Sequence, residues 1–143
     1  MSKMMEEIRE QPAALERTLK AELRGFEQLR ARFAKERPRF VVLAARGTSD
    51  NAAQFGRYLI EISTGIPVSL AAPSVTTLYQ AKIRLEGGLL AAVSQSGEST
   101  DTNVVLEEAK RQGAFTVGIT NEASSTLARI SDFVALVRAG REK

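Results

Sequence analysis

The sequence of 143 residues contains no cysteine and no histidine. Without cysteine the chain can form neither disulfides nor thiolate metal sites, and we expect it in a reducing compartment, the cytoplasm. Without histidine it lacks the usual zinc ligand and the commonest general acid or base at neutral pH. We therefore expect no bound metal, and any proposal of catalysis has few side chains to draw on.

Long apolar runs are also missing. No run approaches the ~20 residues of a membrane-spanning helix, and acidic residues stand in the opening "MSKMMEEIREQP" where a signal peptide needs an apolar core. The net charge of +3 and the aromatic content of 6% do not favour nucleic acid as a partner. A hydrophobic content of 43% against 26% charged residues predicts a globular protein with one core. We therefore expect neither a membrane nor a nucleic acid among its partners.

An amphipathic helix is predicted over residues 12–36, where apolar residues recur every three or four positions. Pro12 suits the first turn of this helix, and the helix should end before Pro38. We interpret residues 1–38 as an N-terminal helical segment that precedes a domain over residues 39–143. We expect the apolar stripe of the helix to cover the core, although it could also serve as an interface. Its members are Leu15, Leu19, Leu23, Phe26, Leu29 and Phe33.

Short apolar segments alternate with helical segments after residue 39. The predicted strands are residues 40–45, 66–72, 87–94, 114–120 and 132–139, and the predicted helices are residues 50–63, 99–112 and 124–131, with a turn and a short helix over 73–82. The first strand is apolar throughout rather than alternating, which is typical of a strand buried on both faces. The order predicts an α/β fold, with a five-stranded parallel sheet between two layers of helices.

The last predicted strand ends close to the carboxyl terminus, with no helix after it to cover it. We therefore expect the domain to be truncated before its last helix. An uncovered strand leaves apolar surface in water, so we also expect the chain to self-associate. The exposed candidates are Val134, Leu136 and Val137.

Two hydroxyl-rich turns, "RGTSDN" at 46–51 and "SQSGES" at 94–99, follow the first and third predicted strands. In an open parallel sheet, ligands bind beyond the carboxyl ends of the strands, where helix amino termini present free amides. In each turn a glycine allows close approach of the backbone and hydroxyls offer rotatable donors. Together the turns predict an anion pocket, which a phosphate fits best. The alternative is that these residues only cap the helices that follow.

Other phosphate-binding motifs are excluded by spacing. A dinucleotide fold needs G-x-G-x-x-G after its first strand, and "ARGTSDNA" has a single glycine. A P-loop needs Gly-Lys-Ser or Gly-Lys-Thr, and neither tripeptide occurs. We therefore expect no nucleotide cofactor.

The segments "AARGTSDNAAQFGRYLIE", "VSQSGESTDT", "GITNEASSTLARISD" and "RAGRE" resemble the first sugar isomerase (SIS) domain of the glucosamine-6-phosphate synthase isomerase unit and of SIS-type glucosamine-6-phosphate deaminases. The resemblance implies a three-layer, flavodoxin-like α/β/α fold that binds a phosphorylated hexose. By position it assigns one turn to the sugar pocket and the other to the phosphate and adjacent hydroxyls. The residues assigned to substrate binding are Gly47, Thr48, Ser49, Ser94, Gln95, Ser96, Gly97 and Ser99.

The resemblance also marks what is absent. In the family, two SIS domains lie in tandem, and the catalytic glutamate, the ring-opening histidine and a lysine belong to the second domain and tail. No catalytic residue is therefore assigned here. The carboxylates nearest the predicted pocket are Glu98, whose pKa a helix start should lower, and Glu142, close to the terminus. We expect the chain alone to bind without turnover.

The first functional interpretation is a domain that anchors the phosphate of a hexose or amino-sugar phosphate, within an isomerase, aminotransferase or deaminase. The expected partners are that sugar phosphate and either further copies of the chain or a second SIS domain. The alternatives are a noncatalytic sugar-phosphate sensor and a dimerisation module. A sensor that regulates transcription would need a DNA-binding helix-turn-helix, and residues 1–38 offer one long helix.

Overall fold

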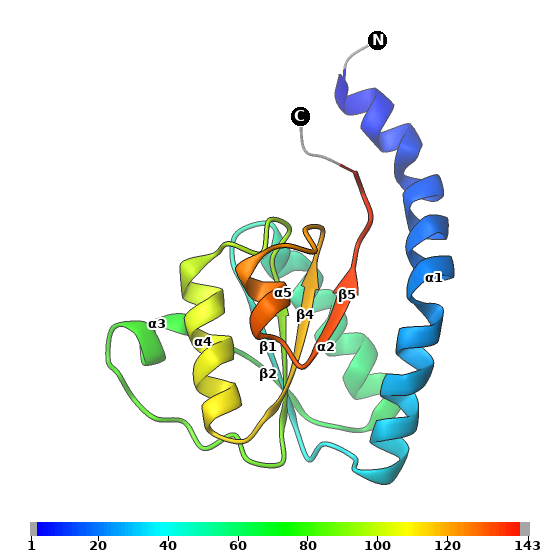
Figure 1. The fold of residues 1–143 in the computed structure, drawn as a ribbon. Helices are drawn as coiled ribbons and strands as arrows, with labels where there is room; N and C mark the ends of the chain where they lie inside the picture. Colours follow the sequence, from blue (N-terminus) through cyan, green and yellow to red (C-terminus); the bar gives the residue numbers. More distant parts are fainter. Residues whose placement is uncertain (1–2, 141–143) are drawn as a thin grey trace.

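A five-stranded parallel sheet forms the centre of the computed structural model, which describes residues 3–140 (Figure 1). The spatial order is β2-β1-β3-β4-β5, the flavodoxin-like arrangement, and confirms the predicted fold class. Glu142, one of the carboxylates considered above, lies outside the described residues. The strands are β1 (Val41–Ala45), β2 (Val68–Leu70), β3 (Leu89–Val93), β4 (Phe115–Thr120) and β5 (Phe133–Leu136).

Helices cover both faces of the sheet (Figure 1). Alternate residues of β1 and β3 enter two separate cores, because successive side chains of a strand point to opposite faces. One core receives residues from α4 (Thr100–Arg111) and α5 (Thr126–Ile130), with α3 (Pro73–Thr77) beside α4. The other core receives residues from α2 (Ser49–Thr64), and α1 (Lys3–Lys35) packs on the same face. The molecule is thus a three-layer α/β/α sandwich.

Helix α1 begins nine residues earlier than predicted. It runs from Lys3 to Lys35, so that Pro12 lies inside the helix and not in its first turn. Proline removes one intrahelical hydrogen bond, but good helix formers surround it, including the run from Met4 to Glu10. The predicted start at residue 12 was therefore wrong.

The prediction that the apolar stripe of α1 covers the core is wrong for its amino-terminal members. Leu15, Leu19 and Leu23 are 58% to 64% exposed. Only the carboxyl-terminal end of the stripe packs on the sheet, where the ring of Phe26 lies 6.0 Å from that of Phe133 and the ring of Phe33 lies 5.7 Å from that of Phe115. The buried and half-buried face of the helix is formed by Ala14, Thr18, Glu22 and Gly25 together with Leu29 and Phe33 of the stripe.

Strand β5 is better covered than its sequence predicts. Helix α1 packs against it, and Val134 and Leu136 are half-buried. Among the three residues expected to be exposed, only Val137 is, at 38%. The long first helix supplies the cover that a following helix was expected to supply.

A carboxylate at the start of β5 ties three elements together. The Oδ2 atom of Asp132 accepts hydrogen bonds from the amide (3.0 Å) and the hydroxyl (2.8 Å) of Thr116, and its Oδ1 atom lies 2.7 Å from the ammonium of Lys110. Burial raises the pKa of Asp132, but the hydrogen bonds from Lys110 and Thr116 outweigh it and hold the pKa below the ordinary value of 3.8. Asp132 should therefore stay ionised throughout the physiological range.

We expect Asp132→Asn to destabilise the protein at pH 7 and to reduce the loss of stability in acid. A carboxylate with a lowered folded pKa contributes stability above about pH 4, and this contribution disappears as the pH falls through the folded pKa. Urea unfolding at pH 7 and pH 3 measures both effects. Asp50→Asn is the control, because Asp50 is exposed. A variant as stable as the wild type at pH 7 would contradict the prediction.

Candidate functional site

The two predicted turns lie side by side at the carboxyl edge of the sheet. Strands β1 and β3 are hydrogen-bonded neighbours, and their last residues, Ala45 and Val93, are paired. The strand order reverses between them, which is the place where open α/β sheets bind ligands. The Nε atom of Arg46, in the first turn, lies 3.7 Å from a carboxylate oxygen of Asp101, in the first turn of α4. The structure thus brings together segments that are about fifty residues apart in the sequence.

The second turn owes its shape to Gly97, whose φ of 68° is in the left-handed region. Its amide donates to the hydroxyl of Ser94 at 3.1 Å, and its carbonyl accepts from the side chain of Asn103 at 3.1 Å and from the amide of Leu127 at 3.0 Å. Ser94 itself is only 7% exposed. Of the residues assigned to substrate binding, Ser94 therefore uses its hydroxyl inside the turn.

Strand β4 holds the same turn from the side. The carbonyl of Gln95 accepts hydrogen bonds from the Thr120 hydroxyl at 3.1 Å and the Asn121 amide at 3.0 Å. A Cβ atom added to Gly97 would lie 2.2 Å from the hydroxyl oxygen of Ser125, so the turn packs directly on the start of α5. The backbone of residues 94–97 is therefore fixed before any ligand arrives.

Four hydroxyl groups remain near the surface of the two turns. Ser96 is exposed and its Oγ atom accepts one hydrogen bond, from the Glu98 amide at 3.3 Å. The hydroxyl of Ser99 bonds only to that of Thr102, at 3.0 Å, among residues 3–140. Thr48 is exposed and Ser49 is half-buried, and no described residue is a hydrogen-bond partner of either hydroxyl.

These hydroxyls do not act as helix caps. Thr48 stands at the N-cap of α2 and Ser99 at that of α4, yet within the described chain neither side chain accepts the capping hydrogen bond. Ser125, at the start of α5, does accept one, from the Ala128 amide at 3.2 Å. The capping alternative therefore fits Ser125 and not the two turns.

Glu98 joins the second turn to α5. Its carboxylate accepts a hydrogen bond from the amide of Thr126 at 2.8 Å. That hydrogen bond, followed by one from the Thr126 side chain, holds the pKa of Glu98 below its ordinary value, and Arg129 lowers it further. The direction predicted from the sequence is confirmed, although the α5 terminus causes it rather than that of α4. An ionised, hydrogen-bonded carboxylate is a poor proton acceptor at neutral pH.

Sequence reasoning missed the polar residues that follow β4 and β5. A hollow of about 720 Å³ adjoins Gln95 and Ser96, and Asn121 and Arg138 line its other side. The amide side chain of Asn121 donates to the Gly140 carbonyl at 2.5 Å and accepts from the Ala139 amide at 2.7 Å. Asn121 and Arg138 each follow the end of a strand, at the edge of the sheet where ligands bind, and this position was the sequence signal that could have identified them.

Helix α1 secures the segment after β5. The carboxylate of Glu22 lies 2.9 Å from Nε and 2.7 Å from an Nη atom of Arg138, and Glu22 is only 9% exposed. One turn earlier, the Thr18 hydroxyl donates to the Val137 carbonyl. Arg138 has a φ of 53°, in the left-handed region, which these contacts hold in place. The first helix thus positions a residue that lines the hollow beside Ser96.

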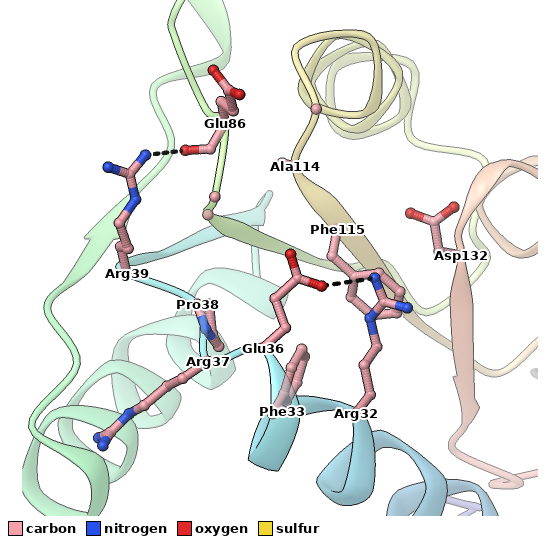
Figure 2. A pocket seen from close by; sticks show the side chains of 13 residues that line it. Arg32, Phe33, Glu36, Arg37, Pro38, Arg39, Glu86, Ala114, Phe115 and Asp132 are labelled. Atoms are coloured by element: carbon pink, nitrogen blue, oxygen red, sulfur yellow. Dashed lines mark hydrogen bonds and ion pairs between the residues drawn. The ribbon is translucent and has the colours of Figure 1, made fainter.

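A larger hollow, of about 1040 Å³, lies at the opposite, amino edge of the sheet (Figure 2). Its cations are already engaged: Arg39 donates to the Glu86 carbonyl at 2.6 Å, and Arg32 lies 4.3 Å from the Phe115 ring centre and 3.9 Å from Glu36. Helices α1, α2 and α4 end at this edge, and helix carboxyl termini carry partial negative charge. Within residues 3–140, this edge therefore lacks the free helix amides that favour anions at the carboxyl edge.

The described residues, 3–140, contain no cluster of three or more carboxylates that could hold a metal ion. No helix in the same part of the chain is long and apolar enough to cross a membrane.

Comparison with known proteins relates the chain to sugar-phosphate enzymes. A glutamine–fructose-6-phosphate aminotransferase (isomerizing) of Symbiobacterium thermophilum is 40% identical over 146 residues, covering 97% of this chain and 24% of the relative. A second, from Aquifex aeolicus, is 37% identical over 139 residues, covering 97% of this chain and 23% of the relative. The chain thus spans about a quarter of the length of these curated relatives.

Solved structures agree with this relationship. The C-terminal domain of glucosamine-fructose-6-phosphate aminotransferase from Francisella tularensis superposes with a TM-score of 0.83 at 33% identity, covering 97% of this chain and 40% of that one. The glucosamine-6-phosphate deaminase of Thermotoga maritima shares the fold, with a TM-score of 0.75 at 24% identity, over 99% of this chain and 42% of that one. The SIS domain family matches residues 33–143, well over half of the sequence. The chain belongs to the SIS domain family.

Proposed function

We propose that this chain binds the phosphate group of a hexose 6-phosphate or an amino-sugar phosphate between its two hydroxyl-rich turns. The observation that carries the proposal is the pair of adjacent turns at the amino termini of α2 and α4. The hydroxyls of Thr48 and Ser96 are exposed, and those of the N-cap residues Thr48 and Ser99 accept no capping hydrogen bond from the described chain. Hydroxyls and free helix amides can replace the water shell of a phosphate without adding a fixed charge.

The comparisons support a sugar phosphate as the ligand. The relatives named above are aminotransferases whose names specify fructose 6-phosphate, and their likeness to this chain extends through both turns. In such a reaction, phosphate anchorage supplies binding energy that positions the reacting end of the sugar. We therefore propose that this chain is the phosphate-anchoring domain of an isomerase, aminotransferase or deaminase.

The acid and base of such a reaction must come from elsewhere. Glu98 lies in the second turn, but its hydrogen bond to the Thr126 amide and its lowered pKa leave it a poor base at neutral pH. We propose that a second SIS domain, or another copy of this chain, supplies the reactive groups. The chain alone then binds the sugar phosphate without converting it.

Calorimetry with fructose 6-phosphate and with fructose tests the proposal. Of the two sugars, we expect only fructose 6-phosphate to bind. We expect Ser96→Ala to weaken binding by about 1.5 to 3 kcal/mol, the typical loss of a hydrogen bond to a charged group. Ser69→Ala is the matched control, because Ser69 is an exposed serine on β2, at the edge of the sheet.

Two results would count against the phosphate site. Equal affinity for fructose and fructose 6-phosphate would show that the phosphate makes no contact of consequence. A Ser96→Ala variant with intact affinity and a lowered melting temperature would show that the hydroxyl only shapes the turn, through its hydrogen bond from the Glu98 amide.

A further inference from the structure

Helix α1 carries an apolar stripe that the described chain leaves exposed except at its carboxyl-terminal end, where Phe26 contacts Phe133. The helix extends beyond the carboxyl edge of the sheet, and its amino-terminal half projects away from the sandwich (Figure 1). Six large apolar residues, between 38% and 70% exposed, follow one side of the helix over roughly 33 Å, given its rise of ~1.5 Å per residue. These residues, called the α1 stripe below, are Met4, Ile8, Leu15, Leu19, Leu23 and Phe26.

The α1 stripe is large enough to matter for association. Side chains exposed to this degree present roughly 100 Å² each, so the stripe offers on the order of 600 Å² per copy, against ~800 Å² per partner in a standard interface. The charged side chains that border the stripe add to this area when a partner lies against it. Contiguous apolar surface of this size on a helix marks an interaction site.

A row of exposed charges borders the stripe and identifies its occupant. Arg9, Glu16, Lys20 and Glu27 are spaced seven, four and seven residues apart, which places them on one side of the helix next to the stripe. From the amino end of the helix to its carboxyl end, the four charges are positive, negative, positive and negative. In the opposite direction the order is negative, positive, negative and positive. The row is therefore complementary to itself when two copies of the helix run in opposite directions.

The apolar residues fit the same register. An antiparallel pair with its axis near residues 17 and 18 brings Arg9 beside Glu27 and Glu16 beside Lys20, pairs that are both centred on residue 18. The same pair brings Ile8 near Phe26 and Leu15 near Leu19, pairs centred on residue 17, about one residue rise of ~1.5 Å from the centre of the charge pairs. Each contact occurs twice, as a twofold axis requires. A parallel pair would instead place equal charges side by side, which disfavours association.

We propose that α1 is a homodimer interface, in which the α1 stripes of two copies of this chain pack antiparallel and the bordering charges pair across the axis. Among residues 3–140 of the monomer, Glu16 and Lys20 pair only with each other, at 2.5 Å along the exposed helix surface. In the dimer each also faces its opposite in the second copy. Charges that flank a helix seam set partner choice and orientation in this way.

A second exposed apolar row, on α2, provides the control. Phe55, Tyr58, Leu59 and Ile62 are 52% to 81% exposed. The charges near this row, Arg57 and Glu61, lie 3.5 Å apart and pair along their own helix. No self-complementary charge pattern accompanies the α2 row, so the dimer should not depend on it.

Charge reversal combined with sedimentation velocity tests the proposal on the 143-residue chain. Glu16→Lys with Glu27→Lys makes the row entirely positive, and Arg9→Glu with Lys20→Glu makes it entirely negative. We expect the wild type to dimerise and each variant alone to associate at least tenfold more weakly. We expect an equimolar mixture of the two variants to form heterodimers. Ile62→Arg, on α2, should leave the dimer intact.

Cysteine cross-linking reports the orientation independently, because the chain has no cysteine of its own. Under oxidation, a mixture of the Leu15→Cys variant and the Leu19→Cys variant should form a disulfide between the two copies. Met4→Cys should not, because in the antiparallel pair the two positions lie roughly 40 Å apart at ~1.5 Å per residue. Circular dichroism confirms that each variant is folded, as expected for substitutions at exposed positions.

Several outcomes would overturn the proposal. These are a monomeric wild type, a dimer that resists both charge variants, a variant mixture that stays monomeric, a dimer that dissociates in Ile62→Arg, or an efficient Met4→Cys disulfide. None of these measurements depends on a sugar ligand, so failure of the interface and failure of the phosphate site are distinguished.

Discussion

Replacing Gly97 by alanine is expected to destabilise the protein by about 3 kcal/mol and to abolish sugar-phosphate binding. The loss of stability has two causes, because the new methyl group overpacks the turn and because a positive φ is unfavourable for alanine. The new Cβ atom would lie 2.2 Å from the hydroxyl oxygen and 2.4 Å from the Cβ atom of Ser125, and 2.9 Å from the hydroxyl oxygen of Thr120. Ser125 and Thr120 are both fully buried and cannot move aside cheaply. Urea unfolding measures the loss of stability, and calorimetry with fructose 6-phosphate measures the loss of binding.

Gly47→Ala is the matched control. Gly47 also has a positive φ, of 62°, but in the described structure nothing lies within 4 Å of an added Cβ atom. Only the backbone penalty remains, so the expected loss of stability is about 1 kcal/mol. Equal losses in the two variants would show that Ser125 yields to the Gly97 side chain and that the second turn is less rigid than its contacts indicate.

Arg138→Ala is expected to cost about 2 kcal/mol of stability, because removing one partner of a partly buried ion pair leaves the other, buried charge uncompensated. The charge left behind is the carboxylate of Glu22, whose side chain is only 10% exposed. The reverse change, Glu22→Ala, should cost clearly less, because the guanidinium of Arg138 is 43% exposed and can still be hydrated. Urea unfolding of the two variants measures this inequality.

The double variant separates the pair from its surroundings. Glu22→Ala combined with Arg138→Ala should be more stable than Arg138→Ala alone, since it no longer holds an unpaired buried charge. Arg24→Ala, at an exposed position of the same helix, controls for the loss of a long side chain. If Glu22→Ala costs as much as Arg138→Ala, the ion pair contributes through packing of the helix and not through the buried charge.

The sheet was predictable because its strands are locally encoded. Apolar runs such as residues 40–45 are buried on both faces, and their alternation with helices leaves few topologies for a parallel sheet. The short second strand was predicted less well. Residues 66–72 were expected, but only Val68–Leu70 pair with β1, at the edge of the sheet and after Pro67, which has no amide to donate.

The two turns of the candidate site could be predicted because the carboxyl edge of a parallel sheet is where ligands bind. Asn121 and Arg138 were missed because their roles arise from contacts with distant parts of the chain. Arg138 is paired with a residue 116 positions earlier. No local pattern in the sequence indicates such a contact.

The apolar stripe of α1 shows a second limit. Its spacing identifies an apolar side of a helix, but spacing does not reveal what covers that side. The face that packs on β5 contains Thr18 and Glu22, which a hydrophobic pattern places in solvent. These two side chains face the sheet because their polar atoms bond to Val137 and Arg138, and the leucines at 15, 19 and 23 are turned outward as a result.

The contact between α1 and the segment after β5 has a consequence for biosynthesis. Helix α1 is translated before the strands of the sheet, whereas Val137 and Arg138, which its Thr18 and Glu22 bind, follow more than a hundred residues later. At a synthesis rate of ~5 to 20 residues per second, the nascent helix waits for several seconds with its polar docking face unoccupied. Throughout that interval the polar face is exposed in addition to the outward leucines, so this helix is most open to chaperones, and to neighbouring nascent chains, before β5 is made.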